Sequence, residues 1–154
     1  MPAVFATCVL NAFVAVRLEG DKPTELWRNT KFLADGSSPL LYRDVLYLIK
    51  NGGILSSVDP ATGQVIRQER VPGFEGNVLA SPIAADGKVL LLNSAGKLAV
   101  IAAGREWQTL KVNELGEAGY ATPALVDDQI LVRTEHSLWA FRKDQLEHQE
   151  AKSP

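Results

Sequence analysis

Residues that could perform catalysis or bind a metal are few in this sequence, and they lie far apart. The two histidines, His136 and His148, have no cysteine or second histidine at the spacing that zinc sites require. Cys8 lies inside an apolar run, where a thiol is expected to be buried and unreactive. No Gly-x-Ser-x-Gly motif marks any serine as a nucleophile. The sequence therefore predicts no catalytic residue and no metal ligand.

Polar residues at the ends of short apolar runs are the remaining candidates for binding. Lys50, Asn93 and Arg133 each follow such a run. We interpret the three as equivalent strand ends that line an axis or a face and bind an acidic partner. Lysine and arginine at strand ends are also commonly just solvated, so a structural role is the competing interpretation.

Composition excludes several classes of function. The 154 residues contain 16 Lys and Arg against 18 Asp and Glu, a net charge of −2, which offers no electrostatic attraction to nucleic acid. No run reaches the ~18 apolar residues that a membrane span needs. The N-terminal run 4–16 has no Lys or Arg before it, so it lacks the charged region of a signal peptide, and we predict a strand there. With a single cysteine, the chain forms no internal disulfide.

The elements that position these residues repeat along the chain. Ser-Pro or Thr-Pro recurs at Pro39, Pro82 and Pro123, with separations of 43 and 41 residues. A polar turn and a short apolar run follow each proline, and the turns carry carboxylates whose recurrence favours a turn role: Asp44, Asp86, Asp127 and Asp128. A second turn and a further apolar run then begin at Leu55, Leu98 and Leu138. Repeats of this length are typical of propellers and solenoids.

Each repeat is expected to form four β-strands. The runs are short, rich in Val, Ile and Leu, and bounded by Gly, Asp, Asn and Pro. Four strands in ~42 residues is the size of one β-propeller blade, a four-stranded antiparallel sheet. We therefore predict an all-β partial propeller over residues 1–142. Its predicted parts are a partial blade 1–33, two blades 34–76 and 77–117, a partial blade 118–142, and a polar tail 143–154.

One repeat carries a more specific pattern. Asp59, Thr62 and Gly63 stand in register with the consensus A-x-D-x-x-T-G-x-x-x-W of the PQQ-type propeller repeat, named after pyrroloquinoline quinone, and the chain resembles that family from about residue 13 to 142. Arg67 stands where the family has tryptophan, whereas Trp27 fills that place in the preceding repeat. The family tryptophan packs between blades. We expect the same packing for the aromatic residues of this chain, which are Trp27, Tyr47, Trp107, Trp139 and Phe141.

The resemblance implies a fold more firmly than an activity. Some members are quinoprotein dehydrogenases that hold PQQ and calcium, and others are cofactor-free scaffolds such as the outer-membrane assembly lipoproteins. The single cysteine excludes the vicinal disulfide that many of the dehydrogenases carry. We therefore expect a non-catalytic protein-binding scaffold without a cofactor. A fragment of a PQQ-dependent dehydrogenase and a carbohydrate-binding or sensing propeller remain alternatives. The family also implies export to the bacterial periplasm.

The number of blades leaves the state of the chain open. The sequence begins within one blade and ends within another, at about 3.7 blades, whereas propellers usually close with ~4–8. The chain is then a fragment of a longer product, a small capped form, or a protein that associates with itself. In the last case, one copy's incomplete last blade is completed by the first blade of another copy, in a head-to-tail contact.

Overall fold

Four antiparallel sheets follow one another along the chain. The computed structural model describes residues 3–8, 12–19, 22–31 and 34–142, which form strands and no helix. Blade 1 contains β1 (Ala3–Cys8), β2 (Ala12–Glu19) and β3 (Lys22–Asn29). Blade 2 contains β4 (Leu40–Tyr42), β5 (Val45–Lys50), β6 (Ile54–Val58) and β7 (Val65–Arg70). Blade 3 contains β8 (Ile83–Ala85), β9 (Lys88–Leu92), β10 (Lys97–Ala102) and β11 (Gln108–Glu114). Blade 4 contains β12 (Ala124–Val126), β13 (Gln129–Arg133) and β14 (Leu138–Arg142).

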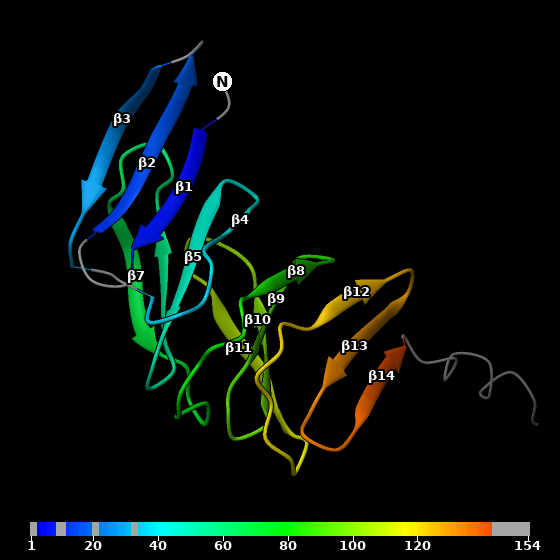
Figure 1. Cartoon of the computed structure of the whole chain (residues 1–154). Coiled ribbons are helices and arrows are strands. Elements are labelled where there is room, and N and C mark those ends of the chain that lie inside the picture. Colours follow the sequence, from blue (N-terminus) through cyan, green and yellow to red (C-terminus); the bar gives the residue numbers. More distant parts are fainter. Residues whose placement is uncertain (1–2, 9–11, 20–21, 32–33, 143–154) are drawn as a thin grey trace, which may run out of the picture.

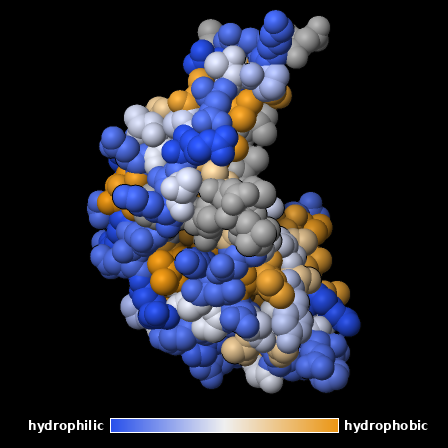
Figure 2. Space-filling view, turned by 60° about the vertical axis from the view of Figure 1, so that its left-hand side comes forward, coloured by the Kyte–Doolittle hydropathy of each residue, from blue (hydrophilic) through white to orange (hydrophobic). Residues whose placement is uncertain are grey.

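The blades stand side by side in an arc rather than in a closed disc, with blade 1 at one end and blade 4 at the other (Figure 1). The predicted all-β partial propeller is confirmed. Figure 2 shows a mostly hydrophilic surface with apolar residues in small groups. The side chain of Cys8, the residue His148 and the predicted tail 143–154 lie outside the described part.

The first and last blades each contain three described strands. The pairing of the last two strands of a blade shifts its register in blades 1, 2 and 3, after Ala15, Ser57 and Val100. We call the first strand of a complete blade its inner strand and the fourth its outer strand. This shared shift aligns β2 with β6 and β10, so blade 1 consists of the second, third and fourth strands of a blade. In blade 4 the three strands correspond to the first, second and third strands. Within the described residues, blade 1 thus has no inner strand and blade 4 has no outer one.

Left-handed backbone at the first hairpin of blades 2, 3 and 4 explains the aspartates that recur there. Arg43, Asp44, Asp86 and Asp127 all have positive φ, between 49° and 56°. Two-residue hairpin turns require such angles, which Asp and Gly tolerate better than most residues. The recurrent carboxylates therefore belong to turn geometry.

The Ser-Pro and Thr-Pro segments, which precede the first strands of blades 2, 3 and 4, are joined to one another by hydrogen bonds. Each proline immediately precedes the first strand of its blade, where its missing N–H costs no ladder hydrogen bond. The backbone N–H of Ser38 donates to Ser81 Oγ at 2.9 Å. The N–H of Ser81 donates in turn to Thr122 Oγ1, also at 2.9 Å. The hydroxyl before each of the last two prolines thus ties one blade to the previous one.

The hydrophobic core lies in the seams between blades. Phe13 packs against Leu46, Leu48 and Val58 in the seam of blades 1 and 2. The seam of blades 2 and 3 is the largest, and its buried members include Tyr47, Ile49, Leu55, Val89, Leu91, Ile101 and Trp107. The seam of blades 3 and 4 contains Leu92, Leu98 and Val132, with Trp139 and Phe141 half-buried beside them. Burial of each such side chain contributes ~1.5–3 kcal/mol, so no blade is expected to be stable without a neighbour.

Candidate protein-interaction site

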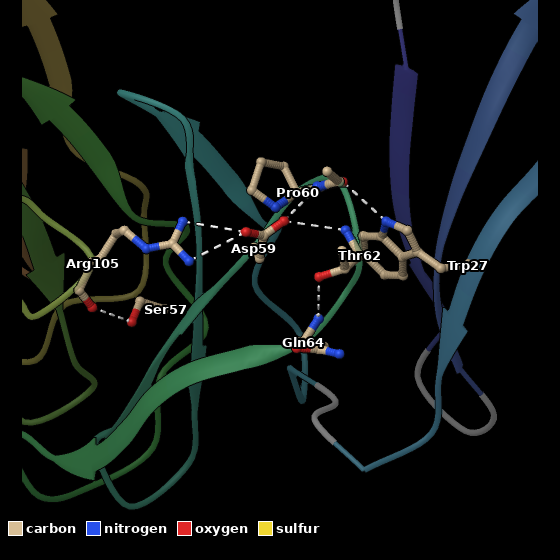
Figure 3. A network of polar contacts seen from close by, with 8 residues as sticks. Trp27, Ser57, Asp59, Pro60, Thr62, Gln64 and Arg105 are labelled. Atoms are coloured by element: carbon tan, nitrogen blue, oxygen red, sulfur yellow. Dashed lines mark hydrogen bonds and ion pairs between the residues drawn. The ribbon is translucent and has the colours of Figure 1, made fainter.

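The PQQ-type motif is a structural joint between blades. Asp59 ends β6, and its Oδ1 accepts hydrogen bonds from the N–H groups of Ala61 and Thr62 at 2.9 and 3.2 Å (Figure 3). Its Oδ2 lies 3.2 Å from Nη1 of Arg105 in blade 3. The hydrogen bond from Ala61, followed by those from Arg105 and Thr62, lowers the pKa of Asp59. Asp59 therefore shapes its own turn and contacts the next blade.

Trp27 covers the turn of this motif from the preceding blade. Its indole Nε1 donates to the carbonyl of Pro60 at 2.9 Å (Figure 3). Its ring meets Phe13 edge to face, with centroids 5.1 Å apart. A Cβ on Gly63 would lie 2.5 Å from this ring, so only glycine allows the approach. Thr62 accepts a hydrogen bond from the N–H of Gln64 at 3.3 Å. These contacts place the motif residues in the seam of blades 1 and 2.

Arg67 stands at the tryptophan position of the family pattern, and its side chain binds an aromatic residue of the next blade. It lies opposite Ser57, as Trp27 lies opposite Ala15, so the two residues are equivalent in register. The Arg67 guanidinium lies 4.6 Å from the ring centroid of Trp107, and its Nη1 donates to the Trp107 carbonyl at 2.8 Å. A cation–π contact and a hydrogen bond thus replace the indole packing of the family pattern.

Aromatic residues occupy all three seams, as the sequence predicts. Tyr47 and Trp107 are buried in the seam of blades 2 and 3, and Trp27 packs in the first seam. Trp139 and Phe141 stack with parallel rings in the third seam. Tyr120, which is 56% exposed, is the one aromatic among the strongly exposed apolar side chains of the described residues.

Acidic residues in the segments between blades form contacts that the sequence analysis missed. Asp35, Glu75 and Glu117 each precede a blade and contact its second hairpin. Asp35 Oδ2 accepts the N–H of Asn51 at 2.8 Å, and Glu75 Oε2 lies 3.8 Å from Lys97 Nζ. Their spacing of 40 and 42 residues repeats the blade period and was the available signal.

Glu117 has the densest set of these contacts. One of its oxygens accepts from Ser137 Oγ at 2.7 Å, and the other accepts from Thr134 Oγ1 at 2.7 Å and from the N–H of His136 at 3.1 Å. The hydrogen bond from Thr134, then that from Ser137, lowers the pKa of Glu117 to about 2. The ionised carboxylate therefore fixes the hairpin of blade 4 to the segment that precedes it.

This lowered pKa predicts a loss of stability in acid. Because the folded-state pKa lies below the unfolded value, the contribution of Glu117 is complete above about pH 4.5 and is lost as the pH falls toward about 2. We expect the urea midpoint of Glu117→Gln to lie below that of the parent at pH 7 and to approach it at pH 2.5. Glu135→Gln, in the same hairpin, is the control and should follow the parent throughout. A constant gap for Glu117→Gln between pH 7 and 2.5 would contradict the assignment.

The three candidate partner-binding residues do not occupy equivalent positions. Lys50 and Asn93 each stand one place beyond the residue that pairs with Leu55 or Leu98, whereas Arg133 itself pairs with Leu138. Asn93 is fully buried: its Nδ2 donates to the Glu75 carbonyl at 2.7 Å, and its Oδ1 accepts from the N–H of Lys97 at 2.9 Å. The side chain of Asn93 therefore stabilises a turn, which is a structural role and not the predicted contact with a partner. Lys50 and Arg133 are exposed, and their binding of a partner stays a prediction.

Lys50 shares a small cleft with a second lysine. Lys50 and Lys31 both line a cavity of about 100 Å³ in front of β5 and β6, together with Leu48, Ser56 and Gln68. Among the described residues neither lysine forms an ion pair, and both are exposed. Two uncompensated cations at one cleft suit an acidic ligand.

A larger, mostly apolar groove separates blades 3 and 4. It has a volume of about 460 Å³, and Leu90, Leu125, Ile130 and Phe141 form its apolar lining. The groove exists because Ala85 and Leu90 stand at the positions of Tyr42 and Tyr47 in blade 2. In the neighbouring seam, the Tyr42 hydroxyl accepts the N–H of Gly87 and the Tyr47 hydroxyl accepts the N–H of Gly104. The seam of blades 3 and 4 thus has room that two tyrosines fill elsewhere.

The described part of the chain brings no three His, Cys, Asp or Glu side chains together in the way that a metal ion requires. Nor does that part contain a helix long and apolar enough to cross a membrane. The expectation that the protein binds no PQQ and no calcium, the cofactors of the dehydrogenase alternative, stays a prediction.

Four successive antiparallel sheets, one of which contains an Asp-x-x-Thr-Gly turn that contacts Trp27 of the preceding blade and Arg105 of the next, define an open β-propeller of the PQQ type. The family model described as outer membrane protein assembly factor BamB matches residues 11–148, and the chain belongs to this family. No curated protein matches the chain.

Solved structures agree on the fold. BamB from Moraxella catarrhalis superposes with a TM-score of 0.73 at 17% identity, over 91% of this chain and 42% of that one. The computationally designed Ika4 protein superposes with a TM-score of 0.71 at 11% identity, over 91% of this chain and 84% of that one. The chain thus spans less than half the length of the BamB structure and most of the Ika4 structure.

Proposed function

We propose that this protein is a non-catalytic scaffold that binds other proteins and takes part in the assembly of outer membrane proteins in the periplasm. The observation that carries the proposal is the match of residues 11–148 to the family described as an outer membrane protein assembly factor. The motif residues support a scaffold role, because Asp59, Thr62 and Gly63 are used for blade packing. The chain covers 42% of the BamB structure, so the activity of that whole protein is a proposal here.

The groove between blades 3 and 4 is the surface that we assign to the partner. Its volume of about 460 Å³ lies within the range of ligand pockets, and its lining is mostly apolar, as in such pockets. Outer membrane β-barrel proteins alternate apolar and polar residues along their strands. An unfolded strand of such a protein therefore presents the apolar side chains that this groove fits.

The proposal is tested with a purified, fluorescently labelled outer membrane β-barrel protein, diluted from urea and followed by fluorescence anisotropy. We expect saturable binding to the chain. The double variant Ala85→Tyr, Leu90→Tyr restores the tyrosines of the neighbouring seam, and we expect it to weaken binding at least ~10-fold by filling the groove. Leu110→Tyr is the matched control, since Leu110 is 53% exposed on the outer strand of blade 3.

Two results would overturn parts of this proposal. Absence of binding by the parent chain would remove the assembly role. Binding that is unchanged in the double variant would remove the groove as its site. Development of a cofactor absorbance band on addition of PQQ and calcium would instead favour the dehydrogenase alternative.

The cleft of Lys31 and Lys50 is proposed as a second contact, for acidic stretches of a partner. Reversal of both charges, Lys31→Glu with Lys50→Glu, is expected to raise the dissociation constant for an acidic peptide about 5-fold at low salt. The difference should shrink as the Debye length falls toward ~3 Å near 1 M salt. Lys22→Glu with Lys111→Glu makes the same change in net charge elsewhere and should leave binding near the parent value. Equal losses in both double variants would contradict a specific cleft.

A further inference from the structure

The groove between blades 3 and 4 has room for one aromatic ring that the neighbouring seam already contains. Tyr42 and Ala85 are equivalent in register, because each is the last paired residue before the first hairpin turn of its blade. Tyr42 packs in the seam of blades 2 and 3, where its hydroxyl accepts the N–H of Gly87 at 2.9 Å. Ala85 has no side-chain atom beyond Cβ, and it lines the groove. The space that the Tyr42 ring fills in one seam is therefore open in the next.

Both sides of this space belong to described hairpins, β8–β9 of blade 3 and β12–β13 of blade 4 (Figure 1). Leu90 lines the side of blade 3, and Leu125 and Ile130 line the side of blade 4. Leu125 is 41% exposed, whereas Ala84, its equivalent in blade 3, packs against the core of the neighbouring seam. The exposed surface of Leu125 is thus available to a ring that enters the groove, and its burial is favourable.

The turn at one end of this space supplies a hydrogen-bond acceptor. The Tyr42 hydroxyl reaches the turn of the following blade that contains Gly87. The corresponding turn of blade 4 consists of Asp127 and Asp128. Asp127 lines the groove and is exposed, and within the described residues its carboxylate forms no hydrogen bond or ion pair. A phenol hydroxyl donates hydrogen bonds, and those to a charged acceptor are the stronger ones, so this turn suits a ring that carries a hydroxyl.

The charges of the lining favour a neutral donor over an anion. Lys88 Nζ lies 3.4 Å from Asp86 Oδ2. Arg142 Nε lies 3.4 Å from Asp128 Oδ2. Both cations of the lining are therefore paired, and Asp127 is an additional carboxylate. With three carboxylates against two cations, the groove repels an anionic ligand and retains one acceptor for a hydroxyl.

We infer that the groove binds a tyrosine side chain of a partner protein, with the ring at the place that corresponds to Tyr42 and the hydroxyl donating to the Asp127 carboxylate. The inference rests on the proposed function and names the side chain that the groove selects. Tyr42 supports it, because this fold accommodates the same ring one seam away. Outer membrane β-barrel proteins carry girdles of aromatic residues, so their unfolded strands supply such side chains. Phenylalanine would fill the space but leave Asp127 without a donor.

Two probes that differ by one hydroxyl test this selection. N-acetyl-tyrosinamide and N-acetyl-phenylalaninamide are titrated separately into the isotopically labelled chain, and the backbone amide signals are followed by NMR. We expect saturable shifts at Ala85, Leu90 and Ile130 with both probes. The dissociation constant of the tyrosine probe should be about 5-fold lower, which corresponds to one hydrogen bond. Absence of saturable shifts at these residues, or equal affinities of the two probes, would overturn the inference.

Two variants separate the ring from the hydroxyl. Ala85→Tyr places the chain's own ring in the groove and should raise the dissociation constant of the tyrosine probe at least ~10-fold, whereas Leu110→Tyr should leave it unchanged. Ala85→Tyr should also raise the urea midpoint, and a lower midpoint would show that the space does not accept a ring. Asp127→Gly tolerates the φ of 52° and removes the acceptor, so both probes should then bind with equal affinity. Asp44→Gly makes the same change in the first turn of blade 2, where φ is 56°, and should retain the preference for tyrosine.

This inference and the proposed function can fail separately. Saturable binding of the tyrosine probe, without binding of the labelled outer membrane protein in the anisotropy assay, would keep the inference and remove the assembly role. Binding of that protein by a chain that does not distinguish the two probes would keep the assembly role and overturn the inference. A preference for tyrosine that persists in Asp127→Gly would overturn the assignment of Asp127 as the acceptor.

Discussion

Replacement of Trp107 by alanine is expected to lower the free energy of unfolding by about 3–5 kcal/mol. The indole is 2% exposed in the largest seam of the protein, where it packs among residues of blades 2 and 3. Its loss opens a cavity between the blades and removes the ring beneath the Arg67 guanidinium. Urea unfolding, followed by circular dichroism, measures the change.

Trp107→Phe is the matched control for this prediction. Among the described residues, Nε1 of Trp107 is buried without a hydrogen-bond partner, so phenylalanine removes no satisfied polar group. A ring also remains under Arg67. We expect a clearly smaller loss than for alanine, because phenylalanine keeps a ring in the seam and leaves a smaller cavity. Comparable losses in the alanine and phenylalanine variants would show that the seam does not depend on ring packing.

The fold could be read from the sequence because one local pattern recurs at one period. A hydroxyl residue before Pro39, Pro82 and Pro123 opens each of the last three blades, and the turns that follow contain residues suited to positive φ. These are local properties of the chain. Neighbouring blades differ little in their packing rules, so repetition itself specified the architecture.

The partners of individual side chains could not be read in this way. Counting forty residues from Arg67 leads to Trp107, yet strand pairing puts Lys111 opposite Val100, as it puts Arg67 opposite Ser57. The exit turn of blade 3 is longer and places Trp107 before β11. Arg67 and its register equivalent Lys111 are 44 residues apart, so a count of forty falls four residues short and ends on the residue that Arg67 binds.

The candidate binding residues show the same limit. Arg133 is one position short of the place that Lys50 and Asn93 occupy, and one position along a strand moves a side chain to the opposite face. Arg133 consequently lies on the side of β13 that faces away from blade 3, and Asn93 is enclosed in a turn. The hydrogen bonds of Glu117 were equally hidden, because an acidic residue in a polar segment has the sequence pattern of a solvated one.

Replacement of Gly63 by alanine is expected to be the most damaging change in the PQQ-type motif. Gly63 has a φ of 71°, and a Cβ there would lie 2.5 Å from the ring of Trp27. The indole must move, and its hydrogen bond to the Pro60 carbonyl is then lost. Backbone strain and the displaced ring together are expected to cost roughly 3 kcal/mol of unfolding free energy.

Gly73→Ala isolates the contribution of the ring, since Gly73 has a φ of 75° and no atom within 4 Å of its added Cβ. That substitution introduces only backbone strain, which lowers the free energy of unfolding by about 1 kcal/mol. In a Trp27→Ala background the ring is absent, so Gly63→Ala should then cost no more than Gly73→Ala. A double-mutant cycle in urea measures this coupling. An unchanged cost of Gly63→Ala without Trp27 would mean that the glycine serves the turn alone, and that the seam of blades 1 and 2 does not depend on the approach of the indole to the backbone.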